Sequence, residues 1–257
     1  MGFRTLVHML SCDRQKRYEA RHDFLTALAD RWGLRTYNRN LAWFHDTNFA
    51  DAWKKFPEAT DYIHERKFTL FNIARSLRGV PGDLAECGVF RGGSSFLMLS
   101  ASEGTGKRFH GFDSFEGLSK PGDLDNVDNG RTFKWGAHDM AVGEDIAGKN
   151  LTSFAGHFKL YKGWIPERFD EVKNNKFSLV HIDVDLYEPT LASLEFFYPR
   201  MSAGGIIVCD DYGFESCPGA RKAMDDFFAA RDAFVIHLTT GQGVAVIPAN
   251  ASDNGRE

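Results

Sequence analysis

Four aspartates come directly after two apolar runs in the second half of the chain. Asp183 and Asp185 end the run Ser178-Leu-Val-His-Ile-Asp-Val-Asp-Leu-Tyr187, and Asp210 and Asp211 end the run Gly204-Gly-Ile-Ile-Val-Cys-Asp-Asp-Tyr212. Such runs are typical of buried strands in a mostly parallel sheet, where ligands bind at the carboxyl ends of the strands. Because neighbouring carboxylates repel one another, we expect a cation among them, and oxygen ligands suit Mg2+, Ca2+ or Mn2+. The pattern predicts a metal-assisted enzyme.

A glycine-rich turn follows an earlier predicted strand. Gly88, Gly92 and Gly93 allow a tight strand-to-helix turn that a ligand can approach closely. Their spacing differs from the G-x-G-x-x-G pattern of dinucleotide-binding proteins, which disfavours a dehydrogenase. Glu86, which we expect to face the crevice, suits a ligand with an ammonium and a sulfonium group, and Asp113 is placed to hold ribose hydroxyls. Together these features predict a site for S-adenosylmethionine, although the glycines alone also fit a structural turn.

The elements that must position these residues alternate between strands and helices. Strands are expected near 84–89, 108–113, 158–163, 177–185, 204–210, 234–239 and 243–248. Helices are expected near 13–34, 48–56, 61–78, 94–102, 165–173, 189–201 and 218–231. This order predicts an α/β, Rossmann-like, doubly wound sheet of seven mostly parallel strands, which ends in an antiparallel hairpin. The long stretch 114–157 is expected to be a lid, with Phe115, Trp135 and His138 facing the acceptor.

Composition limits the class of protein without choosing its chemistry. The chain has 257 residues, a net charge of −4 and a pI near 6.1, which argues against a nucleic-acid partner that needs a basic surface. Four scattered cysteines suit reduced thiols in a cytoplasmic protein, and no apolar run is long enough to cross a membrane. We expect a helical extension over 1–60, an S-adenosylmethionine-dependent domain over 61–250 and a flexible tail over 251–257.

Five motifs occur in an order that resembles a known family. They are Glu86-Cys-Gly-Val-Phe-Arg-Gly-Gly-Ser94, Gly111-Phe-Asp-Ser-Phe-Glu-Gly117, Lys162-Gly-Trp-Ile-Pro166, His181-Ile-Asp-Val-Asp-Leu-Tyr187 and Asp210-Asp-Tyr212. In this order they resemble the macrocin O-methyltransferase family, whose members methylate sugar hydroxyls of natural products. The resemblance covers roughly residues 62–247. Its departure at Gly163-Trp-Ile-Pro-Glu167, where the family often has an acid and Thr-Leu-Pro, concerns the contacts with adenine.

The resemblance implies a fold, two cofactors and a set of roles. It implies a class I methyltransferase fold, S-adenosylmethionine as methyl donor, a divalent cation that is usually Mg2+, a small-molecule acceptor and an assembly of at least two copies. It assigns Asp183, Asp210 and Asp211 to the metal and Asp185 to the general base. The expected cofactor contacts are Glu86, Cys87, Gly88, Ser94, Asp113, Ser114, Gly163, Trp164 and Asp183. We expect His181 to be a core residue or a partner behind the metal ligands.

Other functions remain open from the sequence. A catechol-type methyltransferase would use the same chemistry, because a catechol also chelates a metal through neighbouring oxygens. A metal-dependent glycosyltransferase could use the Asp-x-Asp pattern of Asp183 and Asp185, but it has no need of Glu86 or of the second acid pair. A binding protein without activity would have no reason to keep four mutually repelling acids.

Overall fold

The computed structural model describes residues 7–31, 41–59, 64–126, 134–231 and 233–248. The chain divides into two compact units, Met1–Asp51 and Ala52–Glu257. The boundary between these units lies N-terminal to residue 60, where we expected the helical extension to end. The roles predicted for the extension, the domain and the tail stay predictions.

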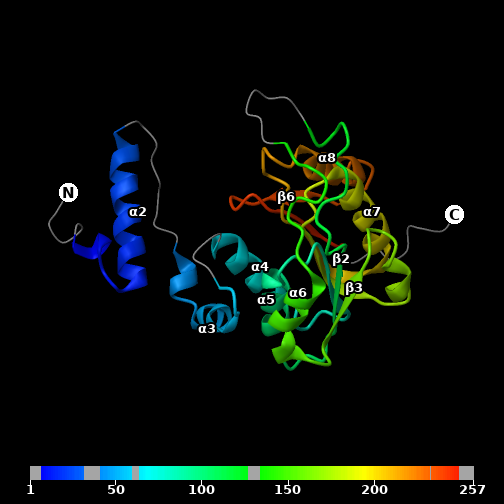
Figure 1. The fold of residues 1–257 in the computed structure, drawn as a ribbon, viewed down its shortest axis with the longest axis horizontal. Helices are drawn as coiled ribbons and strands as arrows, with labels where there is room; N and C mark the ends of the chain where they lie inside the picture. Colours follow the sequence, from blue (N-terminus) through cyan, green and yellow to red (C-terminus); the bar gives the residue numbers. More distant parts are fainter. Residues whose placement is uncertain (1–6, 32–40, 60–63, 127–133, 232, 249–257) are drawn as a thin grey trace. The chain divides into compact units, whose positions relative to one another are not determined.

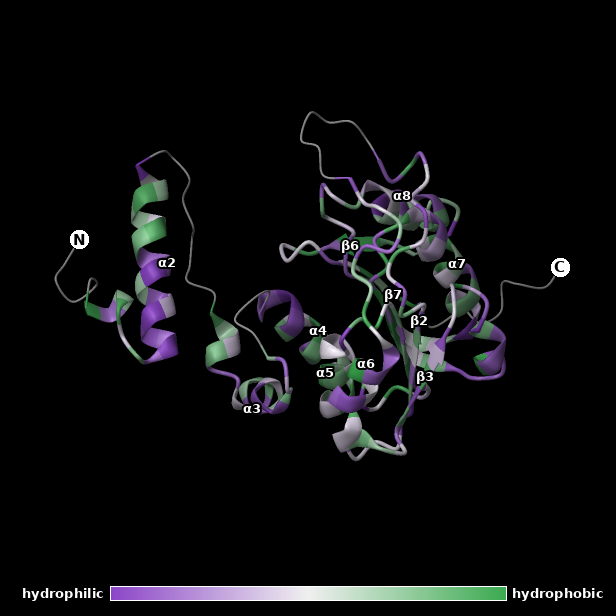
Figure 2. Ribbon diagram, in the orientation of Figure 1, coloured by the Kyte–Doolittle hydropathy of each residue, from purple (hydrophilic) through white to green (hydrophobic). Residues whose placement is uncertain are grey.

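The first unit is helical where it is described. Helix α2 (Arg14–Asp30) begins after Asp13, whose side chain accepts a hydrogen bond from the Lys16 amide at 3.1 Å and so caps the helix. Its first half is hydrophilic and its second half is hydrophobic, as Figure 2 shows. A 3-10 turn, η1 (Ala42–Phe44), and helix α3 (Thr47–Lys55) follow, and α3 continues into the second unit.

The second unit is built on a seven-stranded sheet. Its strands are β1 (Asp83–Cys87), β2 (Phe109–Asp113), β3 (Phe158–Lys162), β4 (Phe177–Ile182), β5 (Met201–Cys209), β6 (Val235–His237) and β7 (Gly243–Val246). They lie in the order β3-β2-β1-β4-β5-β7-β6. Strands β1 to β5 pair in parallel, whereas β7 runs antiparallel to both of its neighbours. The predicted sheet and its C-terminal hairpin are therefore confirmed.

Helices cover both faces of the sheet, as Figure 1 shows. They are α4 (His64–Ser76), α5 (Gly93–Ala101), α6 (Glu144–Asn150), α7 (Tyr187–Phe197) and α8 (Pro218–Phe228), with 3-10 turns η2 (Thr152–Phe154), η3 (Phe169–Val172) and η4 (Tyr198–Arg200). Helices α4, α5 and α6 lie on one side and α7 and α8 on the other. None of the described helices is long and apolar enough to span a membrane.

Aromatic side chains fill the core between the sheet and α7. Phe112 stacks on Tyr161 with ring centroids 4.7 Å apart, and Phe169 and Phe197 meet Phe112 edge-on. These rings are almost wholly buried, and the sequence contains 23 phenylalanines to build such a core. The core fixes the strands so that their carboxyl ends present one continuous edge.

The region between β2 and β3 differs from the prediction. We expected an irregular lid over 114–157, but its second half contains α6 and η2. Helix α6 has only seven residues and includes Gly148, which weakens a helical pattern in the sequence. The expected helix near 165–173 is only the four-residue turn η3.

Candidate active site

A cavity of about 1030 Å3 lies where β1, β2, β4 and β5 end. Gly88 follows β1, Asp113 ends β2, Asp183 follows β4 and Asp210 follows β5, and all four line the cavity. This volume is at the upper end of the range of small-molecule sites, roughly 300–1,000 Å3. The cavity therefore has room for two ligands side by side.

The glycine turn and Asp113 form one hydrogen-bonded unit. Oδ2 of Asp113 accepts from the amides of Val89 and Phe90, each at 2.8 Å, and Oδ1 accepts from the amide of Phe115 at 2.6 Å. Gly88 has φ +88°, and a Cβ there would lie 1.8 Å from the carbonyl oxygen of Asp183. The turn thus needs glycine, and Asp113 keeps part of its accepting capacity on the cavity side.

Glu86 lies behind the cavity and not in its wall. It is fully buried, accepts a hydrogen bond from the hydroxyl of Ser95, and lies 2.8 Å from Nδ1 of His181. Glu86 and His181 are register partners across β1 and β4, which brings the two side chains together on the α5 face. The prediction that Glu86 faces the crevice is wrong. Strand β1 continues past Glu86 to Cys87, and the carboxylate is buried against Ser95 and His181.

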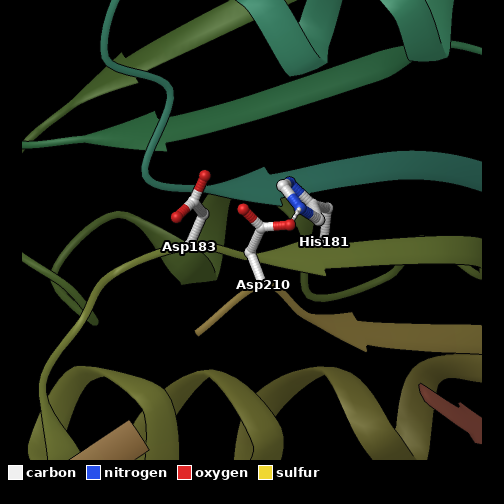
Figure 3. Close-up of side chains that lie close together, drawn as sticks. All are labelled: His181, Asp183 and Asp210. Carbon is white, nitrogen blue, oxygen red and sulfur yellow. Dashed lines mark ion pairs between the residues drawn. The ribbon is translucent and has the colours of Figure 1, made fainter. Parts of the chain in front are cut away.

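His181 connects this buried acid to the aspartates. Its Nε2 lies 3.2 Å from Oδ1 of Asp210, although the angle is not that of a hydrogen bond. Figure 3 shows the imidazole beside Asp210, with the carboxylate of Asp183 next to them. Atoms of these three residues lie within 4.8 Å of one another. His181 thus lies beside two of the acids, and its role as a core residue or as a partner behind metal ligands stays a prediction.

Asp185 and Asp211 form a second group with Cys217. Their ligand atoms also lie within 4.8 Å of one another, and Asp211 accepts from the amide of Asp185 at 3.1 Å. This contact holds Asp185 at φ +60°, a conformation that aspartate tolerates and that often marks a functional position. Burial, and then the charge of Asp183, raises the pKa of Asp185 to about 7. Burial, the largest cause, raises the pKa of Asp211 well above its usual range, and the charges of Asp185 and Asp183 add to this rise.

The three aspartates predicted to bind metal are thus divided between two groups. Asp183 lies with Asp210, whereas Asp211 lies with Asp185. The strand expected over 177–185 also ends earlier, at Ile182, so Asp183 and Asp185 both follow β4. Their assignment to one ion stays a prediction.

Two basic residues of α4, which the sequence did not lead us to expect, enter the acid cluster. Nη2 of Arg66 contacts Oδ2 of Asp210, lies 3.7 Å from Oδ1 of Asp211, and its guanidinium stacks over the ring of Phe214. Lys67 donates to the hydroxyl of Ser94 and lines the cavity. Their position in the first turn of a helix was an available signal, because cations are unfavourable there without a nearby anion.

The donors fit a hard divalent ion in their chemistry. Buried carboxylates that raise the pKa of one another are relieved by a cation, and oxygen ligands suit Mg2+. Arg66 provides that positive charge within the chain itself. A metal ion bound by Asp210 would therefore have to displace the guanidinium.

Only some of the other residues predicted to bind the cofactor lie at the cavity. Ser94, Ser114 and Trp164 line the cavity together with Gly88, Asp113 and Asp183, but Cys87 and Gly163 do not. The Cys87 side chain packs in the core, where burial raises its pKa to about 12. Of the three residues expected to face the acceptor, Trp135 lines the cavity, whereas Phe115 and His138 lie outside its wall.

Known proteins share this fold and parts of this sequence. The chain is 25% identical to the O-methyltransferase NovP, with a TM-score of 0.59 over 72% of this chain and 80% of that one. The calicheamicin methyltransferase CalS11 is 20% identical, with a TM-score of 0.61 over 78% and 93%. The class I methyltransferase fold is therefore confirmed.

Curated relatives match over a shorter stretch. The 8-demethyl-8-(2,3-dimethoxy-alpha-L-rhamnosyl)-tetracenomycin-C 4'-O-methyltransferase of Streptomyces olivaceus is 35% identical over 158 residues, 58% of this chain and 59% of that protein. The demethyldecarbamoylnovobiocin O-methyltransferase of Streptomyces niveus is 30% identical over 161 residues, 60% of each. The chain thus spans about 60% of the length of these relatives. The family model described as macrocin-O-methyltransferase (TylF) matches residues 66–237, and the chain belongs to this family.

Proposed function

We propose that the protein is an S-adenosylmethionine-dependent O-methyltransferase. Its acceptor is a hydroxyl of a sugar or another vicinal diol in a natural product, and Mg2+ or another divalent cation assists the reaction. Family membership supports the reaction class, and the Streptomyces olivaceus relative is named as an O-methyltransferase of a rhamnosyl-tetracenomycin. One observation carries the proposal: a single cavity contains both the glycine turn with Asp113 and the acid cluster with Asp185.

The donor would occupy the half of the cavity near β1 and β2. Bound S-adenosylmethionine supplies a methyl group on a sulfonium, which is electrophilic without further activation. Asp113 has about one acceptor position left for a ribose hydroxyl, because three backbone amides use three of the roughly four positions of a carboxylate. Trp164 lines the same region and offers a ring against adenine. Glu86 supports the site through Ser95 and His181.

The acceptor would occupy the half near β4 and β5. Asp183, Asp210 and Asp211 would hold a divalent cation here, and such an ion would supply Lewis-acid chemistry to a hydroxyl of the acceptor. Asp185 accepts the hydroxyl proton as the new oxygen–methyl bond forms and the sulfur–methyl bond breaks. Its pKa of about 7 in the metal-free protein reflects burial and the charge of Asp183, and a nearby base of this strength is suited to neutral pH.

The parts outside the methyltransferase domain take other roles in this proposal. Residues 1–60 would shape the acceptor side or mediate contacts between subunits, and the working unit would contain at least two copies. Sedimentation of the full chain and of a chain that begins at Ala52, where the second unit begins, tests the contribution of the first unit to this assembly.

Calorimetry with S-adenosylhomocysteine tests the proposed function. Metal-stripped protein is titrated with this product, then with Mg2+, and with a nicotinamide dinucleotide and a sugar nucleotide as controls. Micromolar binding of S-adenosylhomocysteine is the expected result and justifies screening of sugar and catechol acceptors with labelled methyl donor. Binding of the sugar nucleotide with Mg2+, without binding of S-adenosylhomocysteine, would favour a glycosyltransferase instead.

A further inference from the structure

Cys217 is a thiol at the cavity wall with no role in the reaction proposed above. It directly precedes α8, is only 2% exposed, and lines the cavity together with Asp185 and Asp211. Its Sγ donates to Oδ1 of Asp185 at 3.3 Å. Burial raises the pKa of the thiol, and the charges of Asp211 and Asp185 add to this rise, so Cys217 keeps its proton and acts as a donor.

The chain around Cys217 fixes the place of this donor. The amide of Cys217 donates to the carbonyl of Phe214 at 3.0 Å, and the hydroxyl of Ser216 lies 3.5 Å from Sγ. The indole of Trp135 donates to the carbonyl of Ser216 at 2.8 Å, which ties this turn to the region between β2 and β3. The thiol therefore approaches Asp185 from a turn that is anchored independently of it.

Asp185 is held at two points, and one of its carboxylate oxygens is free. Asp211 accepts from the Asp185 amide at 3.1 Å, and Cys217 donates to Oδ1. Among the residues that the structure describes, none donates a hydrogen bond to Oδ2. Because the backbone and one oxygen are both held, rotation of the carboxylate is restricted, and Oδ2 is left for a hydroxyl of the acceptor.

The same contact keeps Asp185 apart from the acids expected to hold a metal ion. Carboxylates bind divalent cations through one or both of their oxygens. Ligation through both oxygens of Asp185 would break the contact between Oδ1 and Cys217, whereas proton transfer at Oδ2 leaves it intact. The contact therefore favours the use of Asp185 as a base.

We propose that Cys217 is a positioning residue for Asp185. The thiol holds Oδ1, and Oδ2 takes the proton of the acceptor hydroxyl while the oxygen–methyl bond forms and the sulfur–methyl bond of the donor breaks. This inference rests on the proposed function and adds the residue that orients its base. The thiol itself stays protonated throughout and exchanges nothing with the substrate.

The S–H stretching band of Cys217 provides a test that needs no acceptor. Subtraction of the infrared spectrum of Cys217→Ser from that of the wild type isolates this band, because a hydroxyl does not absorb in the same region. A hydrogen bond lowers its frequency, so we expect Asp185→Ala to raise the frequency and added Mg2+ to leave it low. Cys209→Ala, which removes a buried thiol from the core outside the cavity wall, should leave the band of Cys217 unchanged.

Kinetics with labelled S-adenosylmethionine tests the role of the contact. The acceptor probes are the rhamnosyl-tetracenomycin for which the Streptomyces olivaceus relative is named and 3,4-dihydroxybenzoate, a catechol. Cys217→Ala should lower kcat by about 10- to 100-fold, the effect of a misplaced catalytic group, with little change in KM or in binding of S-adenosylhomocysteine. Cys217→Ser keeps a donor and should restore most of kcat. In an Asp185→Asn background, Cys217→Ala should cause no further loss, because no base is left to orient.

The outcomes separate this inference from the proposed function. A band that does not respond to Asp185→Ala, or that moves to higher frequency when Mg2+ is added, overturns the inference. A fall in kcat that is equal with and without Asp185 also overturns it, because Cys217 would then act only on the structure. If neither probe is methylated, or if Cys217→Ala does not fold, the band decides the inference. Failure of the wild type to bind S-adenosylhomocysteine overturns the proposed function, whatever the band shows.

Discussion

Substitution of Gly88 by alanine tests whether the turn and the acid cluster share one backbone contact. An alanine at φ +88° costs about 1–2 kcal/mol from backbone conformation alone. Its Cβ would also lie 1.8 Å from the carbonyl oxygen of Asp183, a main-chain atom that cannot rotate away. The ends of β1 and β4 must separate, which costs about 1–3 kcal/mol in packing. It also weakens the hydrogen bond from the Asp183 amide to the Cys87 carbonyl, worth about 0.5–1.5 kcal/mol.

We therefore expect Gly88→Ala to lower the free energy of unfolding by about 3–6 kcal/mol, a large part of the roughly 5–15 kcal/mol typical of a domain. Two other glycines separate the causes. Gly104 has φ +78° and open space where the methyl group of an alanine would lie, so Gly104→Ala should show only the conformational cost of about 1–2 kcal/mol. Gly79 has neither a positive φ nor a close neighbour, and Gly79→Ala should be neutral or slightly stabilising.

Urea unfolding followed by circular dichroism measures all three variants against the wild type. The expected order of stability is Gly79→Ala, then Gly104→Ala, then Gly88→Ala. Equal losses in Gly104→Ala and Gly88→Ala would refute the reasoning, because the contact with Asp183 would then have no cost. Binding of S-adenosylhomocysteine, measured below the onset of unfolding, should be weakened only in Gly88→Ala.

Three further predictions concern charges. Asp185→Asn should reduce turnover by about 100- to 10,000-fold while Mg2+ and S-adenosylhomocysteine still bind in calorimetry, and near-normal turnover would remove Asp185 from its role as base. Arg66→Met should tighten Mg2+ binding in the same titration, because the ion no longer competes with a guanidinium for Asp210; unchanged or weaker affinity counts against this competition. Burial raises the pKa of Asp83, but hydrogen bonds, first from His110, outweigh it and leave the pKa lowered. The stability that Asp83 provides relative to Asp83→Asn should therefore be complete at neutral pH and decline as the pH falls below about 4; a difference independent of pH would contradict this.

The sheet could be predicted because its strands carry an unambiguous pattern. Apolar runs such as the one that ends at Ile182 are bounded by glycines or acids, and such runs predict buried parallel strands. Helix α6 was missed because seven residues with an internal glycine show no apolar periodicity. Its position is set by packing against β3, which local sequence does not reveal.

The acids of the site could be predicted, but their partners could not. Asp183, Asp185, Asp210 and Asp211 stand at strand ends, and strand ends meet at one edge of a parallel sheet. Arg66 lies 144 residues before Asp210, so only the folded chain brings the two together. Glu86 was predicted incorrectly. Its position near the carboxyl end of β1 suggested that its side chain faces the crevice, but its contact with His181 keeps it buried.

Arg66 and Lys67, the adjacent cations of α4, have different partners in the site. Arg66 already neutralises Asp210, which allows the acid cluster to pack in the absence of a metal ion. Lys67 differs, because within the described part of the chain its ammonium donates to the hydroxyl of Ser94 and to no carboxylate. Binding of a divalent ion by Asp210 would therefore have to release Arg66. Because both residues lie in the same turn of one helix, movement of Arg66 away from Asp210 also changes the field at Lys67. We therefore expect Mg2+ and S-adenosylmethionine to influence the affinity of one another through α4, with equal coupling in both directions.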